Sequence, residues 1–179
     1  MRIMGPKYMT AGMGDAGACH PRDNIALRWL AAEYDIGYDL FDTIMHAREI
    51  QAKNLAEFLV KHSNGLPIVI HGKAYKPDVP YCIGSYSTLV GYYVKESGHN
   101  VKYLDPLADD NADVIDSVTQ PCVLLLAHNR HVTYGYTGDV GDDNFYCNIP
   151  QGSIIVDPWR KMPQTNNYTV IHYGNTRNN

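Results

Sequence analysis

A cysteine flanked by charged residues follows a glycine-rich segment near the start of the chain. The segment reads TAGMGDAGACHPRDN, and Cys19 precedes Arg22 and Asp23 in it. A thiol just before a helix N-terminus and near a cation is activated as a nucleophile, because both stabilise the thiolate. The alternative is a buried structural thiol, since free cysteine is among the most buried residue types. The residues alone leave both interpretations open.

The glycines before this cysteine fit the pattern G-x-G-x-x-G at Gly12, Gly14 and Gly17. A dinucleotide-binding fingerprint needs a strand before the first glycine and a helix that starts inside the motif. The preceding RIMGPKYMTA contains a glycine–proline pair and predicts no strand, and Pro21 follows too soon for a helix to begin inside the motif. We therefore expect an ordered loop that presents Cys19.

Other residues suggest chemistry less specifically. His20 adjoins Cys19, but neighbours in sequence rarely face each other, so a hydrolase-type Cys–His dyad is not favoured. His128 and His131 form H-x-x-H without a third ligand nearby, and we expect no metal site. Asp105, before a proline at a predicted strand end, is either a turn residue or the ribose-side acid of a nucleotide-binding unit.

The elements that must position these residues begin with two helices. Asp23 is a plausible N-cap for a helix after Pro21, which Asp35–Gly37 should end. A second helix is predicted over Asp39–His62, where apolar residues recur at every third or fourth position. This helix is long for a small domain, so both faces need partners, and it could form the spine of a dimer.

After Asn64 the pattern changes to short β-branched runs. Strands are predicted in LPIVIHGKAY, NVKYLDP, VTQPCVLLLAHN, SIIVDPW and YTVIHYG, and a helix closed by Gly98 in GSYSTLVGYYVKESG. A long polar loop with a short helix is expected over Arg130–Asn148. This order predicts an α/β fold in which a helical segment is followed by a Rossmann-like parallel-sheet domain. We place the active-site loop and dimerisation helices in residues 1–64 and the Rossmann-like domain in residues 65–179.

Composition excludes several function classes. The chain of 179 residues has a formal net charge of −4, which argues against a nucleic-acid binder. No apolar run approaches the ~20 residues that span a bilayer, so no membrane association is expected. The cysteines form no C-x-x-C pair, which predicts free thiols. The N-terminus has no apolar signal core, so we expect a cytoplasmic protein.

The segment GMGDAGACHPRDNIAL resembles the active-site segment of the UDP-glucose/GDP-mannose dehydrogenase family, whose usual pattern is G-x-G-x-G-G-x-C-x-P-K-D before an apolar helix. Downstream, GKAYKPDVPYCIGSYSTLVGYYVKESGHNVKYLDP and SIIVDPWR are similar to that family's C-terminal nucleotide-sugar-binding domain. Order and spacing of the two matches agree, so the resemblance covers nearly the whole chain.

The resemblance implies oxidation of a sugar C6 alcohol to a carboxylate, with two hydride transfers to NAD and a cysteine thiohemiacetal and thioester between them. It implies that Cys19 is the nucleophile and that Asp23 orients or activates water. The sequence P-R-D after the cysteine favours the UDP-glucose type. Arg22 replaces the usual lysine, which is associated with the cofactor side, and arginine is no simple substitute in a tight site.

The resemblance also implies a set of residues that contact the nucleotide sugar. Lys76, from KAYK, is expected to contact it, with a solvated lysine at a strand end as the alternative. Arg2 lies one residue from where some members place an arginine that reaches a neighbouring subunit's substrate. The remaining expected contacts come from the glycine-rich segment: Tyr8, Met9, Thr10, Ala11, Gly12 and Ala16. Ile83 stands where the family has an arginine linked to cofactor binding, which puts NAD contact from this domain in question.

In this family a full N-terminal Rossmann domain binds NAD. The resemblance therefore implies a C-terminal portion of a nucleotide-sugar 6-dehydrogenase, with NAD bound mainly by a domain absent from this chain. The implied partners are a nucleotide sugar, with a UDP-sugar favoured, a second copy in a homodimer, and a separate NAD-binding chain. The alternative is a non-catalytic nucleotide-sugar-binding or assembly module.

Overall fold

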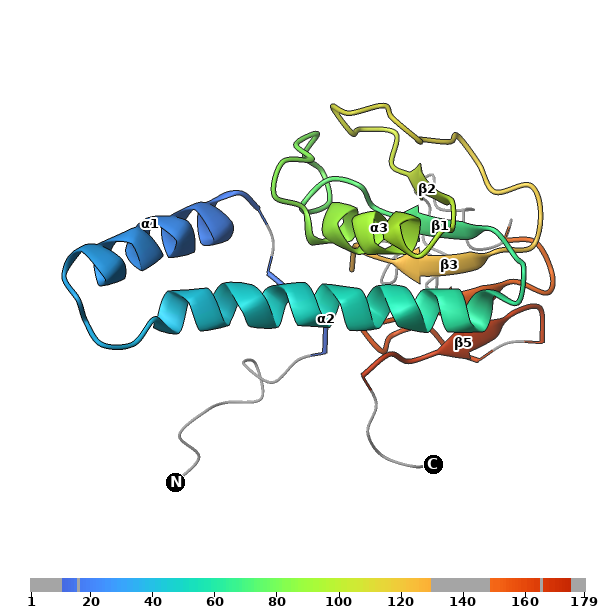
Figure 1. The fold of residues 1–179 in the computed structure, drawn as a ribbon. Helices are drawn as coiled ribbons and strands as arrows, with labels where there is room; N and C mark the ends of the chain where they lie inside the picture. The colour runs from blue at the N-terminus through green and yellow to red at the C-terminus, as the bar shows by residue number, and fades with distance from the viewer. Residues whose placement is uncertain (1–10, 16, 130–148, 165, 175–179) are drawn as a thin grey trace, which may run out of the picture.

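A computed structural model describes residues 11–15, 17–129, 149–164 and 166–174. Two helices lead into a parallel sheet that carries a third helix (Figure 1). The elements in chain order are α1 (Cys19–Glu33), α2 (Leu40–Ser63), β1 (Ile68–His71), α3 (Tyr86–Glu96), β2 (Val101–Leu104), β3 (Val123–Leu126), β4 (Ile154–Val156) and β5 (Thr169–Ile171). Each strand, and the helix α3, lies within a segment for which the sequence predicts it.

The sheet has the order β2-β1-β3-β4-β5, and every neighbouring pair is parallel. The predicted α/β, Rossmann-like fold is thus confirmed. The order reverses at β1, because the chain runs out to β2 on one side and then returns to β3 on the other. In open parallel sheets, ligands bind beyond the carboxyl ends of the strands at such a reversal. The glycine-rich segment approaches the sheet from this end (Figure 1).

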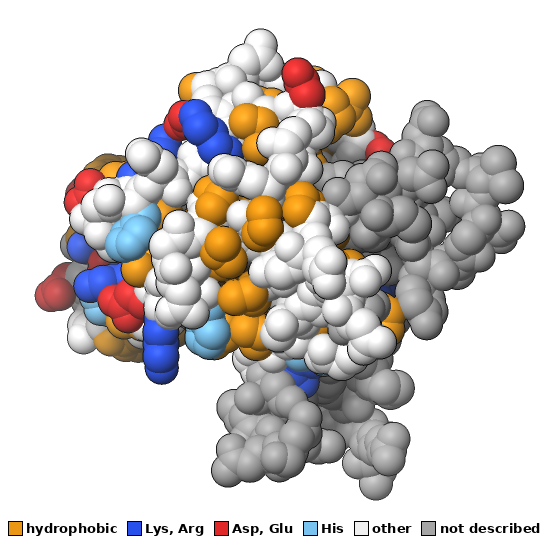
Figure 2. Space-filling model, turned by 90° about the vertical axis from the view of Figure 1, so that its right-hand side faces the viewer, with side chains coloured by type: hydrophobic (Ala, Val, Ile, Leu, Met, Phe, Trp, Pro, Cys, Tyr) orange, Lys and Arg blue, Asp and Glu red, His pale blue; other side chains and the backbone are white. Residues whose placement is uncertain are grey.

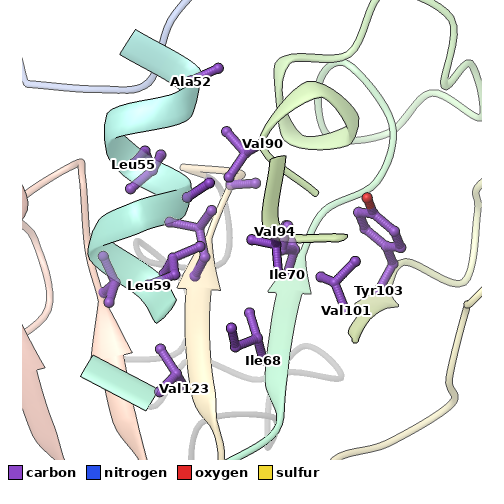
Figure 3. Packing of buried hydrophobic residues seen from close by; sticks show 14 of the residues in the cluster. Ala52, Leu55, Leu59, Ile68, Ile70, Val90, Val94, Val101, Tyr103 and Val123 are labelled. Atoms are coloured by element: carbon purple, nitrogen blue, oxygen red, sulfur yellow. The ribbon is translucent and has the colours of Figure 1, made fainter. Parts of the chain in front are cut away.

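The helix α2 is the central packing element. Asp39 caps its N-terminus by accepting a hydrogen bond from the Asp42 amide at 2.8 Å, and Asn64 ends it in the left-handed conformation. Its C-terminal half buries Leu55 and Leu59 against the sheet, beside Val90 of α3 (Figure 3). The two helices α2 and α3 therefore cover the same face of the sheet.

The opposite face of the sheet is covered by connecting segments. Leu124 and Leu126 of β3 point to this side, together with Ile155 of β4, and they pack with Met162 and Trp159 from the segment after β4.

The edge at which the strands begin lies on the far side of the molecule from the glycine-rich segment, and a band of hydrophobic side chains crosses it (Figure 2). A ligand site at the strands' carboxyl ends is thus walled by α2, α3 and the segment after β4.

The start of α1 corrects one expectation. The helix begins at Cys19 with Ala18 as its N-cap, five residues before the predicted cap at Asp23. Pro21 is accommodated in the first turn, where the missing N–H would have no helical partner in any case. The prediction that Pro21 prevents a helix from starting within GDAGACHP was wrong, although α1 does begin after the last glycine of the motif. The thiol therefore lies on the helix and not before it, at the end where the dipole is positive.

The helix α1 and the first half of α2 project away from the sheet (Figure 1). Large hydrophobic side chains are exposed on these helices and on the connection between them: Ile25, Leu27, Trp29, Leu30, Tyr34, Ile36, Tyr38, Leu40, Ile44 and Ile50. The described parts of the chain leave this apolar surface without a cover. No described helix is long and apolar enough to cross a membrane.

The division of the chain at residue 64 stays a prediction. The C-terminal half of α2 shares its core with the sheet on the other side of that boundary, through Ala52, Leu55 and Leu59. The predicted loop over Arg130–Asn148 lies outside the described residues.

Candidate functional site at the glycine-rich loop

The glycine-rich loop lies directly on aromatic rings of the α/β unit. A β-carbon on Gly14 would stand 2.5 Å from the Tyr86 ring, and one on Gly12 would stand 2.8 Å from the Trp159 ring. Gly17 has a φ of +89°, and a β-carbon there would stand 3.2 Å from Tyr75. Contacts this short require glycine, because a side chain would collide with a ring.

A fourth close approach joins the loop to the segment before α3. Gly84 has a φ of +74°, and a β-carbon on it would stand 2.6 Å from the backbone nitrogen of Ala18. The two backbones therefore touch just before Cys19. The start of α1 is thus held against the segment that leads into α3.

The rings that receive the loop all come from the carboxyl end of the sheet. Tyr75 follows β1, Tyr86 begins α3 and Trp159 follows β4. A dinucleotide fingerprint needs its glycine faces open to the pyrophosphate, but here aromatic rings fill them, and residues 11–15 form neither helix nor strand. The described loop therefore does not fit NAD.

Cavities lie on either side of this loop. One of about 190 Å³ is lined by Gly12, Met13, Gly14, Gln51, Leu55, Tyr86, Pro158 and Tyr173. The other, of about 280 Å³, is lined by Asp15, His20, Asn24, Ile44, Met45, Ala47, Arg48, Gln51 and Tyr86. Gln51 and Tyr86 line both, so the two cavities adjoin beneath the loop. A smaller one of about 50 Å³ reaches Ala127, which follows β3 at the reversal of the sheet.

The predicted catalytic residues share the first turn of α1. Cys19 is followed by Arg22 and Asp23 at the spacings that place side chains on one face of a helix. The Arg22 Nε donates to Asp23 Oδ1 at 2.8 Å, and both side chains are largely exposed. The hydrogen bond and charge of Asp23 raise the pKa of Arg22, and the Cys19 sulfur contributes to the same rise.

Lys76 lies at the edge of the same loop. Its ammonium stands over the Tyr75 ring, 5.3 Å from the centroid, and that ring is the one that contacts Gly17. Ala11 leads directly into Gly12, which lines the 190 Å³ cavity. Five of the predicted substrate contacts lie outside the described residues: Arg2, Tyr8, Met9, Thr10 and Ala16.

A polar cluster beside the loop was missed by the sequence reasoning. Arg48 of α2 donates through Nε to Asp15 at 2.7 Å and stands over the Tyr86 ring, 5.7 Å from the centroid. The Tyr93 hydroxyl of α3 donates to Glu49 at 2.6 Å. Burial raises the pKa of Tyr86 to about 12, so it stays a neutral phenol. The signal available was the charged pair Arg48–Glu49 within the apolar repeat of the long helix.

Asp105 fixes the backbone after β1. Its carboxylate accepts hydrogen bonds from the amides of Lys73 and Ala74, each at 2.9 Å, and of Leu107 at 3.2 Å. These bonds support the turn interpretation. His128, the first histidine of H-x-x-H, lies with Nε2 2.9 Å from the Ala74 carbonyl oxygen, and His131 falls outside the described residues. Within the described ranges, no cluster of three or more potential metal ligands occurs.

Asp157 likewise fixes the backbone of the segment that follows β4. This fully buried carboxylate accepts from the amides of Trp159 at 2.8 Å and of Met162 at 2.7 Å. The Trp159 indole donates in turn to the Leu126 carbonyl at 2.9 Å. Trp159, whose ring contacts Gly12, is thereby fixed through both its backbone amide and its indole nitrogen.

No family model matches the chain, but two curated proteins are similar to it. UDP-glucose 6-dehydrogenase TuaD of Bacillus subtilis (strain 168) is 26% identical over 115 residues, which are 63% of this chain and 25% of that protein. UDP-glucose 6-dehydrogenase of Rhizobium meliloti (strain 1021) is 25% identical over 113 residues, which are 61% of this chain and 26% of that protein. The resemblance to the UDP-glucose/GDP-mannose dehydrogenase family is confirmed.

A solved structure also matches the fold of this chain. The ternary complex of GDP-mannose dehydrogenase from Pseudomonas aeruginosa superposes with a TM-score of 0.68 and 17% identity, over 93% of this chain and 41% of that one. At this identity the match concerns the fold alone. The chain spans about a quarter of the length of the curated dehydrogenases that it matches.

Proposed function

We propose that this chain is the C-terminal part of a nucleotide-sugar 6-dehydrogenase that oxidises a UDP-glucose-like substrate to the uronate with NAD. The observation that carries the proposal is the docking of the glycine-rich loop at the carboxyl end of the sheet. There it adjoins cavities of about 190 and 280 Å³ and leads directly into Cys19. The similarity to curated UDP-glucose 6-dehydrogenases supports the same reaction.

The nucleotide sugar would bind along the glycine-rich loop. The residues that we assign to this contact are Arg2, Tyr8, Met9, Thr10, Ala11, Gly12, Ala16 and Lys76. Lys76 supports the assignment because its exposed ammonium lies beside the loop, where it can attract the diphosphate of a sugar nucleotide. The aromatic lining of the 190 Å³ cavity, with Tyr86 and Tyr173, suits a planar or sugar ring.

Cys19 would carry the covalent steps. Its thiolate attacks the C6 aldehyde carbon, a C–S bond forms, and the carbonyl oxygen takes up a proton to give a thiohemiacetal. Loss of a hydride from that carbon, together with release of the hydroxyl proton to solvent, leaves a thioester. Asp23, one helical turn from Cys19, would then take a proton from the water that attacks the thioester. The carboxylate is released and the thiol is restored.

The hydride acceptor must be held elsewhere. NAD would accept one hydride in each of the two oxidations, but the described glycines are filled by aromatic rings and do not fit its pyrophosphate. We therefore assign NAD to a second domain or a separate chain, with Arg22 as the contribution from this side. A homodimer formed through the apolar surface of α1 and α2 completes the proposed assembly.

A non-catalytic nucleotide-sugar-binding or assembly module is the second candidate. One observation favours it: Cys19 and Asp23 are exposed, and neither lines a described cavity beside the loop. Such a module would keep the substrate cavity and the dimer surface without turning over substrate.

A reconstitution experiment separates the two candidates. The full chain is mixed with the N-terminal NAD-binding domain of a UDP-glucose 6-dehydrogenase, and NADH formation is followed with UDP-glucose as substrate. The dehydrogenase proposal predicts turnover that Cys19→Ala abolishes. The module predicts no turnover in any mixture, with UDP-glucose binding retained by both the parent chain and Cys19→Ala.

A further inference from the structure

An ion pair between the glycine-rich loop and α2 joins Asp15 to Arg48. The Arg48 side chain is 11% exposed and the Asp15 side chain 24%, and the Nε–Oδ1 distance is 2.7 Å. The bond links residues 33 positions apart in the chain. Asp15 is the charged residue inside GMGDAG, and Cys19 follows it by four residues.

The guanidinium is itself held from several sides. It stands over the Tyr86 ring of α3, and its Nη1 lies 3.9 Å from Glu49 Oε1. The other oxygen of Glu49 accepts from Tyr93, also of α3, at 2.6 Å. Two helices thus set the direction of the Arg48 side chain before it meets the loop. With two carboxylates beside one guanidinium, the cluster has no excess positive charge with which to bind an anionic ligand.

The loop needs a directional contact of this kind. Glycine has more backbone freedom than any other residue, and contacts between glycines and aromatic rings are apolar and tolerate sliding. A charge-assisted hydrogen bond fixes both distance and angle. Asp15 lies between Gly14, which makes a ring contact, and Cys19, the first residue of α1.

We propose that Arg48 is a positioning residue for Cys19: its ion pair with Asp15 fixes the glycine-rich loop to α2 and so holds the first turn of α1 in place. The role given to Cys19 rests on the proposed function, whereas the clamp on the loop does not. Arg48 acts through the loop and has no contact with a reacting atom.

Hydrogen exchange of the full chain tests the clamp directly. Asp15→Asn and Arg48→Gln should each speed amide exchange in residues 12–18 about tenfold, the scale of a lost hydrogen bond to a charged group. Exchange in α3 should stay unchanged. The double variant should exchange no faster than either single variant, because both remove the same bond.

Arg28→Gln is the matched control. Arg28 pairs with Asp39 and Asp42 at 3.2 and 3.1 Å, at the other end of the two-helix segment, so its loss should leave the loop unchanged. The proposal is overturned if residues 12–18 exchange at the parent rate in Asp15→Asn and Arg48→Gln, if α3 accelerates equally, or if the double variant shows the product of the two single effects. Asp15→Asn decides the matter alone if Arg48→Gln does not fold.

A second readout reports on the thiol itself. Cys19 is already exposed, so loosening the first turn cannot expose it much further, but it displaces the backbone N–H groups of the helix N-terminus that stabilise negative charge on an attacking sulfur. Alkylation of Cys19 by iodoacetamide should therefore slow about threefold in both variants and keep its parent rate in Arg28→Gln. An unchanged rate overturns the positioning role. Neither readout requires UDP-glucose, so a failure of the proposed function would appear separately, as a parent chain that binds no sugar nucleotide.

Discussion

Gly12, Gly14 and Gly17 are glycines because aromatic rings occupy the space where their side chains would be. The rings belong to Trp159, Tyr86 and Tyr75. The packing of a loop against a sheet end therefore accounts for the spacing G-x-G-x-x-G. The sequence context indicated this much, because no strand is predicted before the motif. It could not identify the rings, since they lie 58 or more positions further along the chain.

Gly14→Ala tests this explanation at a single residue. The added methyl would stand 2.5 Å from the Tyr86 ring, so we expect a loss of about 1–3 kcal/mol in the free energy of unfolding, measured with urea. In a Tyr86→Leu background the ring is gone, and Gly14→Ala should cost clearly less. An equal cost in both backgrounds would show that the ring is not the reason for the glycine.

The described thiols should differ sharply in reactivity. Burial raises the pKa of Cys122 to about 11, and it raises the pKa of Cys82 as well, whereas Cys19 is exposed. At neutral pH, Cys122 then holds about a hundredfold less thiolate than an ordinary thiol. In a Cys147→Ser background, iodoacetamide at pH 7.5 should modify Cys19 first, as read by peptide mass spectrometry. Modification of Cys122 at a similar rate would contradict the burial.

At the scale of elements, periodicity predicted most of the fold. The long helix expected over Asp39–His62 is α2, Leu40–Ser63, because its apolar spacing and its aspartate cap agree. The strand β1 was predicted from a short β-branched run, and the other strands from short apolar runs between turn residues. The predicted start of α1 was wrong because we treated a proline in the first turn as a barrier to the helix, although that position tolerates proline.

The half of α2 that packs on the sheet should contribute more to stability than the half that projects. Leu59 is fully buried, so Leu59→Ala should lower the free energy of unfolding by about 2–5 kcal/mol. Ile50 is 46% exposed on the same helix, and Ile50→Ala should cost less than about 1 kcal/mol. Chemical denaturation followed by far-ultraviolet circular dichroism gives both values. Similar losses for the two would contradict the packing of α2.

At the scale of the whole molecule, the apolar surface of α1 and α2 predicts self-association. Trp29 is 63% exposed and Ile25 59%, and a stable dimer of ordinary size would cover such side chains. Analytical ultracentrifugation should show a dimer that Trp29→Glu converts to monomer. Tyr92→Glu, at an exposed position on α3, serves as the control and should leave the dimer intact. A strictly monomeric parent chain would contradict the prediction.

The candidate site was less predictable than the fold. Family resemblance supplied Cys19, Asp23 and Lys76, which are motif residues. The clamp between Asp15 and Arg48 was not predicted, because it depends on how a loop and a helix meet in space and has no fixed spacing. The sequence left Asp105 as either a turn residue or a ribose-side acid, and its hydrogen bonds from backbone amides favour the turn residue.

Calorimetric titration of the full chain with UDP-glucose tests the central claim most directly. The account predicts saturable binding to the parent chain, with affinity retained in Cys19→Ala because the thiol acts after binding. GDP-mannose and NAD, titrated in parallel, should bind more weakly, since the UDP-sugar is the favoured partner and the described glycines do not fit a dinucleotide. No detectable binding of either nucleotide sugar would contradict the dehydrogenase proposal and the non-catalytic module alike.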